Sequence, residues 1–519
     1  MVSTTSFISL LRQELKIRGQ TQICLLNATH IATLYCKDTV AHHIKNLCNN
    51  SSGCIVVTLT SCYYHVDHME QICHDSFNMR CCTEPVEIVH SHPILSSPDE
   101  LCYRSNILNT LCPLPSRSKE QLECFQLEKY VHVEDNLWAL NLYASHYNID
   151  TLLFNSLQHI TWLLGLHEIS ISGCLSNAFL LYHQGNYLIF SDDPINNTLP
   201  LLDLDHHLTT IGNIGGDHRY LPLHLIKNHG IVDCPILWSY QQRKSQQFIQ
   251  SSIESHTIDS ICWIKLLFFI KTNRDSIRDW TEYDLRYFID NTRRSTCSYL
   301  YKSFDSIVAF KSSATVLHYH PSQYNSKSLD EDGLLLLDLG AHYMGGTTDV
   351  SRTVSLGEPT DQQRLLYTKV LKSHLFFKRC FDSKYTIQHN CTKALSLLKP
   401  YSCPHLLTHG VGYMQSVHEP GFMADTYLKP HNIITNEPGI YEQNCGIRIE
   451  NVHYMGYCGK LHDLTVVPYE TSLIDLSLLD DVERKQITSY WQLIKQRVWL
   501  RLSTSEQDFL RNYVGTFSL

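Results

Sequence analysis

The sequence predicts a mixed α/β fold, and the alternation of apolar and amphipathic stretches is the main evidence for it. Short apolar runs rich in β-branched residues occur at residues 21–26, 54–59 and 86–89, with amphipathic stretches between them. Such alternation is typical of an α/β domain. Helical patterns follow at residues 241–273 and 281–299, and beyond them glycine-rich turns separate short strand-like runs. The chain is therefore expected to combine strands and helices.

A second block of the same kind follows the first. A helical pattern is expected at residues 150–157, and an apolar run follows at residues 160–164. Two strand-like runs at residues 178–182 and 187–191 are joined by a short connection that contains Gly185, which predicts a β-hairpin. The first two blocks are therefore alike in character.

Two breaks in this pattern divide the chain. One lies near residue 135 and the other near residues 230–235, after which long helical patterns take over. With 519 residues and 43% hydrophobic content, the chain is long enough for several domains of about 150 residues each. We therefore expect three domains, at residues 1–135, 136–234 and 235–519.

Composition and charge argue against several classes of protein. The formal net charge of −9 is spread along the chain, so nothing resembles the basic footprint of a nucleic-acid-binding protein. The apolar stretch at residues 261–270 is about half of a bilayer span and contains Lys265, so no membrane span is expected. The first 15 residues lack the features of a secretory signal and read as an amphipathic helix, which makes the cytoplasm the expected compartment. The 20 scattered cysteines are accordingly expected to be reduced.

Two aspartates flank a predicted hairpin in the third domain. Asp338 directly follows the apolar run at residues 334–337, and Asp349 follows a turn that contains Gly345 and Gly346. A single aspartate after a strand is usually a turn or capping residue. A functional interpretation of this pair therefore needs support from other parts of the chain.

Three residues of the C-terminal part supply that support: Glu437 in TNEPGIY, Glu450 in GIRIENV and His409 in HLLTHGVGY. Four carboxylates brought together without cations would repel one another, at a cost of ~4 kcal/mol for each pair about 4 Å apart. Carboxylates with one imidazole suit Mn²⁺, Co²⁺ or Zn²⁺, and bridging carboxylates can hold two ions roughly 3.5–4 Å apart. The composition favours a two-metal site, although spacing alone leaves open whether the five residues meet. A zincin motif fits poorly, because Leu406 replaces its glutamate between His405 and His409.

Four motifs together resemble those of the pita-bread metallopeptidases: DLGAHYMGGTTDVSRT, HLLTHGVGYMQSVHE, TNEPGIY and GIRIENV. Within this family they are most similar to the cytosolic three-domain aminopeptidases P, or Xaa-Pro aminopeptidases. The resemblance is strong over residues 235–519 and fainter upstream. It implies two creatinase-like α/β domains followed by a C-terminal pita-bread catalytic domain.

The resemblance also implies roles for individual residues. The implied metal ligands are Asp338, Asp349, His409, Glu437 and Glu450. The implied histidines around the metals are His318, His405 and His418. His320 lies close enough to His318 to be an alternative, and spacing favours His318.

The implied reaction is removal of the N-terminal residue from peptides with proline at the second position. A hydroxide that bridges two divalent ions would attack the Xaa-Pro bond, and Glu437 would relay its proton to the leaving nitrogen. His418 and His405 would bind the carbonyl and the developing oxyanion, while His318 would position the substrate. Mn²⁺ is the expected metal, with Zn²⁺ or Co²⁺ as alternatives, and a homodimer is expected.

The chain departs from the family pattern at three places. Leu339 stands where a serine is common, and Thr408 stands where a glycine is common. The first-domain DGRY-like sequence is replaced by residues 61–64, SCYY, which removes an arginine. Substrate choice is therefore in more doubt than chemistry. A prolidase, which cleaves only Xaa-Pro dipeptides, and a non-catalytic peptide-binding module remain as alternatives.

Overall fold

The structure is a computed structural model of the chain, and it describes the part from residue 140 onwards together with six strands before residue 127. The described residues from 140 on are 140, 144, 148–155, 157–164, 166–168, 178–183, 186–191, 198–218, 221–234, 241–296, 298–414, 417–419, 422, 425–442 and 444–515. The predicted helix in the first 15 residues lies outside them. Two compact units are distinguished, one of residues 1–121 with 204–233 and one of residues 122–203 with 234–519. The predicted domain boundaries stay a prediction.

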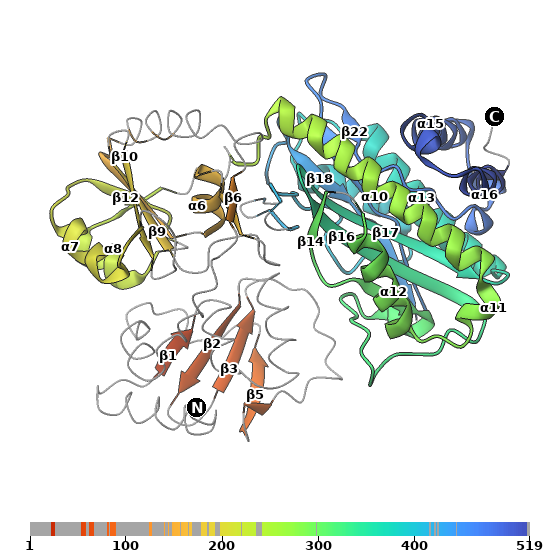
Figure 1. The fold of residues 1–519 in the computed structure, drawn as a ribbon, viewed down its shortest axis with the longest axis horizontal. Helices are drawn as coiled ribbons and strands as arrows, with labels where there is room; N and C mark the ends of the chain where they lie inside the picture. Colours follow the sequence, from red (N-terminus) through yellow and green to blue (C-terminus); the bar gives the residue numbers. More distant parts are fainter. Residues whose placement is uncertain are drawn as a thin grey trace. The chain divides into compact units, whose positions relative to one another are not determined.

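The early strands confirm the strand predictions of the first block (Figure 1). They form a five-stranded sheet in the order β1-β2-β3-β5-β4, in which β3 and β5 are parallel and the other pairs are antiparallel. Their bounds are Gln22–Leu25 (β1), Gly53–Thr58 (β2), Cys62–Val66 (β3), Arg80–Cys81 (β4) and Glu84–Val89 (β5). The predictions at residues 21–26, 54–59 and 86–89 are confirmed by β1, β2 and β5.

In the second block the predicted hairpin is confirmed and one predicted helix is wrong. Strands β9 (Ala178–His183) and β10 (Asn186–Ser191) pair antiparallel, as predicted. The predicted helix at residues 150–157 is wrong, because strand β7 (Thr151–Phe154) occupies most of it and pairs with β9. All four residues of β7 are buried, and periodicity cannot distinguish such a short apolar run from a helix. Helix α6 (Leu157–Leu163) begins after it and takes most of the apolar run at residues 160–164.

Shorter elements complete the chain before residue 234. Strand β6 (Cys124–Gln126) pairs antiparallel with β8 (Leu166–Glu168), and β10 pairs in parallel with β11 (Thr198–Leu199). The remaining elements are η3 (Leu201–Asp203), α7 (Leu204–Thr209), β12 (Ile214–Gly216), α8 (Leu223–His229) and β13 (Val232–Asp233).

The predicted long helix near residue 250 is confirmed as α10 (Gln246–Thr272). Ser245 caps it by accepting a hydrogen bond from the backbone N–H of Phe248. The next prediction, a helix at residues 281–299, is correct only up to α12 (Glu282–Arg294). The chain then turns through Ser298, whose φ is +64°, because Tyr299 and the residues after it pair with a long strand instead.

That long strand is half of the hairpin whose strands contain the two aspartates. Strands β16 (Gly333–Tyr343) and β17 (Gly346–Leu356) pair antiparallel along their whole length. Gly345, in the two-residue turn between them, has a φ of +101°, which favours glycine. Strands β14 (Tyr299–Lys302) and β15 (Ile307–Phe310) pair with the other edge of β16. Figure 1 shows α10 lying across β16 and β17.

Helices and short strands complete the C-terminal part. The strands form one sheet in the order β18-β21-β22 and one hairpin, β19-β20. Their bounds are Ile433–Asn436 (β18), Gly439–Glu442 (β19), Cys445–Arg448 (β20), Asn451–Met455 (β21) and Leu461–Asp463 (β22). The helices are α11 (Arg274–Ile277), η4 (Lys311–Thr315), α13 (Asp361–Cys380), α14 (Ile387–Leu395), η5 (Ser396–Leu398), η6 (Thr471–Leu473), η7 (Leu476–Leu478), α15 (Asp481–Val498), η8 (Trp499–Arg501) and α16 (Thr504–Val514).

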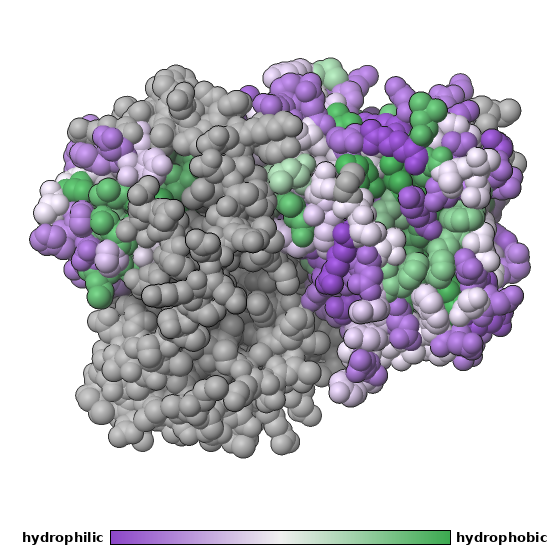
Figure 2. Space-filling model, viewed as in Figure 1, coloured by the Kyte–Doolittle hydropathy of each residue, from purple (hydrophilic) through white to green (hydrophobic). Residues whose placement is uncertain are grey.

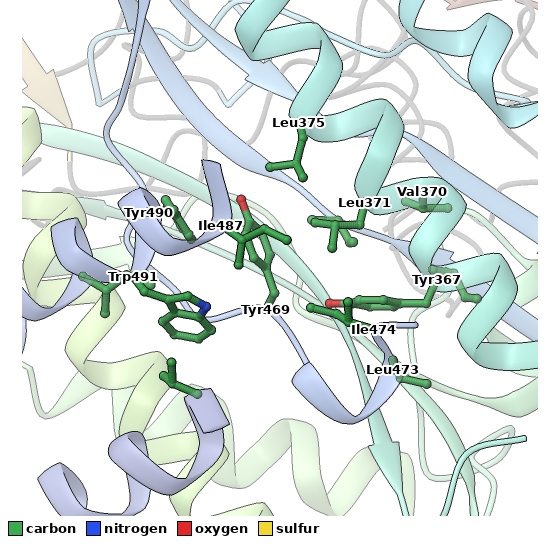
Figure 3. Packing of buried hydrophobic residues seen from close by; sticks show 14 of the residues in the cluster. Tyr367, Val370, Leu371, Leu375, Tyr469, Leu473, Ile474, Ile487, Tyr490 and Trp491 are labelled. Carbon is green, nitrogen blue, oxygen red and sulfur yellow. The ribbon is translucent and has the colours of Figure 1, made fainter. Parts of the chain in front are cut away.

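An aromatic and aliphatic core holds α13 and α15 against the rest of this part. Leu371 of α13 and Ile487 of α15 pack near Tyr469, which lies in the segment before η6 (Figure 3). Tyr469 stacks on Tyr490 of α15, with ring centroids 4.8 Å apart. Helix α15 therefore belongs to the core of the C-terminal part.

The visible surface of the C-terminal part mixes hydrophilic and hydrophobic residues (Figure 2). Such scattered apolar residues are normal on a protein surface. Among the described residues, no helix combines the length and the apolar character that crossing a membrane requires. The cysteines whose side chains are described are all free: Cys234, Cys262, Cys380, Cys391, Cys403, Cys445 and Cys458.

Candidate metal centre

The β16-β17 hairpin places its two aspartates on one face. Asp338 stands opposite Ser351, and Asp349 stands opposite Gly340. Because side chains alternate between the two faces of a strand, Asp349 and Ser351 share a face, and Asp338 shares it with them as their cross-strand neighbour. Both aspartates are buried. The hairpin therefore holds two carboxylates side by side away from water.

His409 and Glu437 come from two segments that run beside each other. The backbone N–H of Thr435 donates to the carbonyl of His409 at 3.0 Å, and the N–H of Glu437 donates to that of Leu407 at 2.9 Å. His409 Nε2 lies 3.4 Å from Asp349 Oδ2 and 3.4 Å from Glu437 Oε1. The imidazole therefore lies between a carboxylate of the hairpin and the carboxylate that follows β18.

Glu450 reaches the same place from the junction of β20 and β21. Its backbone N–H donates to the carbonyl of Ser351 at 3.1 Å, and its Oε2 accepts a hydrogen bond from Ser351 Oγ at 2.7 Å. Ligand atoms of Asp349, His409 and Glu450 all lie within 4.8 Å of one another. All five candidate ligands are thus gathered at one place, with Asp338 joined through the hairpin and Glu437 through His409.

The carboxylates of this cluster repel one another, and added positive charge would stabilise them. Burial raises the pKa of Asp349, Glu437 and Glu450 well above the usual range, and the neighbouring carboxylates raise each pKa further. In the described part of the chain, Asp338 Oδ1 and Glu450 Oε1 are buried without a hydrogen-bond partner. Buried oxygens are rarely left so, and divalent cations would satisfy them and offset the repulsion. The donor set fits a carboxylate-rich metal site.

Three further polar residues of the cluster were missed at the level of sequence. Arg448 donates to Asp338 Oδ2 at 2.6 Å, to Ser351 Oγ at 2.9 Å and to the hydroxyl of Tyr441 at 2.8 Å. The two-residue period of a strand offered a signal for Arg448. It lies two positions before Glu450, and in an extended segment such residues point to the same face. Ser351 has the same kind of signal, because it lies two positions after Asp349 on one face of a strand. The link to Tyr441 depends on a tertiary contact, and no comparable pattern in the sequence points to it.

His405 and His418 lie beside the five candidate ligands. The His418 ring is 4.1 Å from that of His409, measured between centroids. His405 Nε2 lies 2.8 Å from the hydroxyl of Tyr441, which links this histidine to Arg448. Burial, and next the charge of Arg448, lower the pKa of His405 to about 3. His405 is therefore neutral at neutral pH.

The two exposed or half-buried histidines of the VLHYHP segment face different groups. His318 is among the groups that lower the pKa of His405, whereas His320 is among those that lower the pKa of Asp305. His318 is therefore the one of the pair that lies toward the cluster. This arrangement agrees with the spacing argument for His318.

The departures from the family pattern leave the cluster intact. Leu339 is buried in the apolar core beneath α10, on the face of β16 opposite to Asp338. Thr408 is buried as well, and its hydroxyl donates to the carbonyl of Thr435 at 2.6 Å. The segment that carries His405 and His409 is not helical, so the zincin geometry, which needs both histidines on one helix, is excluded.

Fold and cluster together define the class: a mixed α/β protein whose C-terminal part gathers four carboxylates and an imidazole as a metallopeptidase site would. The model of metallopeptidase family M24 matches residues 254–456, and that of its C-terminal region matches residues 458–516. Together they cover half of the chain. This chain belongs to metallopeptidase family M24.

Relatives in other organisms agree with this membership. The chain is 27% identical over 395 residues to Xaa-Pro aminopeptidase 1 of Dictyostelium discoideum, covering 67% of this chain and 62% of the relative. It is 33% identical over 225 residues to a probable Xaa-Pro aminopeptidase P of Verticillium alfalfae, covering 39% of this chain and 37% of the relative. The chain thus spans less than two thirds of the curated relatives it matches.

Solved structures share the fold. A crystal structure of X-prolyl aminopeptidase from Caenorhabditis elegans, described as a cytosolic enzyme with a di-nuclear active site, superposes with a TM-score of 0.74 at 19% identity. It covers 99% of both chains. An Xaa-Pro dipeptidase from Bacillus anthracis superposes with a TM-score of 0.54 at 20% identity, covering 65% of this chain and 99% of its own. The pita-bread fold predicted from the motifs is confirmed.

Proposed function

We propose that this protein is a metal-dependent Xaa-Pro aminopeptidase, which removes the N-terminal residue from peptides with proline at the second position. The observation that carries the proposal is the convergence of all five predicted ligands in one cluster, in which Asp338, Asp349 and Glu450 are buried. The names of the relatives, mostly Xaa-Pro aminopeptidases, support the substrate class.

The five ligands would hold two divalent ions. These ligands are Asp338, Asp349, His409, Glu437 and Glu450, and ligand atoms of Asp349, His409 and Glu450 already lie within 4.8 Å of one another. Mn²⁺ is the proposed metal, with Zn²⁺ or Co²⁺ as alternatives that suit the same donors. Such a pair of ions supplies a hydroxide nucleophile near neutral pH.

Residues of the chain would supply the remaining steps. Glu437 would take a proton from the attacking water and deliver it to the proline nitrogen as the bond breaks. His418 would donate a hydrogen bond to the carbonyl or the developing oxyanion. His405 is expected to do the same, but in its neutral form its one N–H, on Nδ1, donates to the carbonyl of Leu406 at 2.9 Å, so this role requires a second proton on Nε2. His318, on the exposed side, would position the peptide. Proline lacks an N–H, so its recognition depends on shape and apolar contact.

The wider setting is also proposed. A cytoplasmic location agrees with the description of the Caenorhabditis elegans neighbour as cytosolic. A homodimer and the three-domain organisation follow from the family resemblance. The expectation of no nucleic-acid or membrane partner rests on the net charge of −9 and on the apolar runs of the sequence.

Cleavage assays on three peptides test the proposal. The purified protein, stripped of metal and resupplied with Mn²⁺, is offered the tripeptide Ala-Pro-Ala, the dipeptide Ala-Pro and the proline-free tripeptide Ala-Ala-Ala. Release of alanine from Ala-Pro-Ala, with little cleavage of the other two, is the expected result. Cleavage of Ala-Pro alone would favour a prolidase, and no cleavage of any peptide would favour a non-catalytic binding module.

A further inference from the structure

A buried ion pair lies next to the candidate metal centre and is not part of it. Lys244, just before α10, places its Nζ 2.5 Å from Oε1 of Glu419. The two side chains are 0% and 1% exposed. An ion pair so fully removed from water loses much of its hydration, and a pair of apolar residues would fill the same space at a lower cost. The retention of this pair therefore calls for a reason other than packing.

The lysine side of the pair is firmly held. Its ammonium group donates to the carbonyls of Gln241 at 3.1 Å and of Gln242 at 3.2 Å as well as to Glu419, so its three N–H groups are all used. The backbone of Lys244 exchanges two hydrogen bonds with His431, at 3.1 Å through its N–H and at 2.9 Å through its carbonyl. Lys244 is therefore a fixed point at the start of α10.

Glu419, the other partner of the pair, lies in a segment that contacts the candidate metal centre. Glu419 follows His418 in the chain, and its backbone N–H donates to the carbonyl of Gly410 at 2.7 Å. Gly410 in turn follows the candidate ligand His409, whose ring lies 4.1 Å from the ring of His418. A Cβ on Gly410 would approach that of Glu419 to 3.1 Å and a ring carbon of Phe422 to 2.8 Å. The segment with His418 therefore packs closely against the one with His409.

We infer that Glu419 is a positioning residue, which through its ion pair with Lys244 fixes the direction from which His418 faces the metal centre. His418 and Glu419 are neighbours, so a carboxylate anchored on one side restricts the imidazole on the other. A hydrogen-bonded ion pair defines both distance and direction, whereas apolar contacts leave a loop freer to shift. This inference rests on the proposed function, in which His418 donates to the substrate carbonyl or oxyanion.

Glu419→Gln tests the inference, since glutamine keeps the size of the side chain and removes its charge. We expect kcat for Ala-Pro-Ala to fall by about 10- to 100-fold, because a misplacement of about 1 Å can cost this much. KM and the Mn²⁺ content should stay within about twofold of the wild type, because no ligand is changed. A kcat close to the wild-type value would overturn the inference.

Two further variants guard against a loss of folding. In Lys244→Met with Glu419→Leu, no buried charge is left unpaired, so the double variant should fold and bind Mn²⁺ while its kcat stays low. Lys372→Met is the matched control, because Lys372 pairs with Glu483 at 2.6 Å between α13 and α15. It should lower the melting temperature and leave kcat unchanged. Full kcat in the double variant would show that packing alone suffices.

Crystal structures separate this inference from the proposed function. In the wild type the ring centroids of His409 and His418 should lie about 4 Å apart, as here, and in Glu419→Gln the His418 ring should move by about 1 Å or more. An unmoved ring would contradict the positioning role even if the wild type cleaved no peptide. An inactive wild type with a displaced ring in the variant would instead overturn the proposed function and leave the positioning role standing.

Discussion

Glu437 is proposed both to bind a metal ion and to transfer a proton. It lies at 3.4 Å from the imidazole of His409, and it accepts a hydrogen bond from the hydroxyl of Thr435 at 3.1 Å. Its pKa is raised by burial and then by Glu450 and Asp349. These neighbouring charges disfavour the ionised carboxylate in the metal-free protein, and bound cations would favour it again.

Replacing Glu437 by glutamine should nearly abolish turnover. Glutamine keeps an oxygen for a metal and cannot carry the proton, so kcat for Ala-Pro-Ala should fall by about 10²- to 10⁴-fold. Steady-state kinetics with saturating Mn²⁺ measure this. Because a buried negative charge is removed, the metal-free variant should be no less stable than the wild type. Preserved turnover would contradict the role given to Glu437.

Arg448 is positively charged and stabilises the carboxylate cluster. It is buried, and it donates to Asp338 and Ser351 on the hairpin as well as to Tyr441. Without a metal, it balances part of the negative charge of the cluster. Its loss would leave the carboxylate of Asp338 buried and unpaired.

Arg448→Met should therefore destabilise the metal-free protein by about 3–5 kcal/mol, the usual cost of removing one partner of a buried pair. Urea denaturation in the presence of a chelator measures this change. Arg501→Met is a suitable control, since Arg501 pairs with Glu254 on the surface and should matter by less than about 1 kcal/mol. Equal stabilities of the two variants would contradict the role of Arg448.

Individual residues of the site were predictable to different degrees. Asp338 and Asp349 follow an apolar run and a glycine turn, and their motifs stand in a fixed order with those of His409, Glu437 and Glu450. Arg448 lies inside one of these motifs, and the two-residue period places it on the same face as Glu450. Its task could still not be predicted, because it depends on hydrogen bonds to strands about a hundred positions earlier. Local patterns do not carry such contacts.

Helix α10 brings polar groups into the core of the C-terminal part. Its buried residues include Ser252, His256, Asp259 and Ser260 as well as Trp263. Burial, and next the charge of Arg497, lower the pKa of His256 from 6.5 to about 3. The folded protein therefore keeps this imidazole neutral at a pH where the unfolded chain protonates it.

This difference makes α10 sensitive to acid. The unfolded chain binds a proton at His256 between pH 6.5 and about 3 and the folded chain does not, so stability is lost as the pH falls through 6.5. His256→Gln should reduce the slope of unfolding free energy against pH in this window by up to about 1.4 kcal/mol per pH unit. Urea denaturation at pH 7 and pH 5 measures both slopes. Other titrating groups are common to both proteins, so equal slopes would contradict the neutral, buried state of His256.

Helices and strands were predicted best where their patterns are long. The pattern at residues 241–273 covers α10, whereas four buried residues, Thr151–Phe154, were mistaken for a helix. The helix predicted at residues 281–299 ends at Arg294, because pairing with β16 takes the residues from Tyr299 on. Tertiary contacts override local preference at both places.

The fold of the whole chain is shared with a solved structure, and the predicted ligands lie in the C-terminal half. The match to metallopeptidase family M24 begins at residue 254, and the predicted ligands all lie within it. The superposition on the Caenorhabditis elegans structure extends over 99% of the chain. Residues 62–64 of the altered SCYY segment fall in β3, whose side chains lie outside the described residues, so substrate selection stays a question for the assays above.

The claim that unites these observations is a pair of divalent ions held by five residues. Anomalous scattering from crystals soaked in Mn²⁺, recorded at wavelengths on either side of the manganese edge, tests it directly. The expected result is two manganese peaks about 3.5–4 Å apart between Asp338, Asp349, His409, Glu437 and Glu450. A single peak, peaks elsewhere or no peak would contradict a two-metal centre at this place.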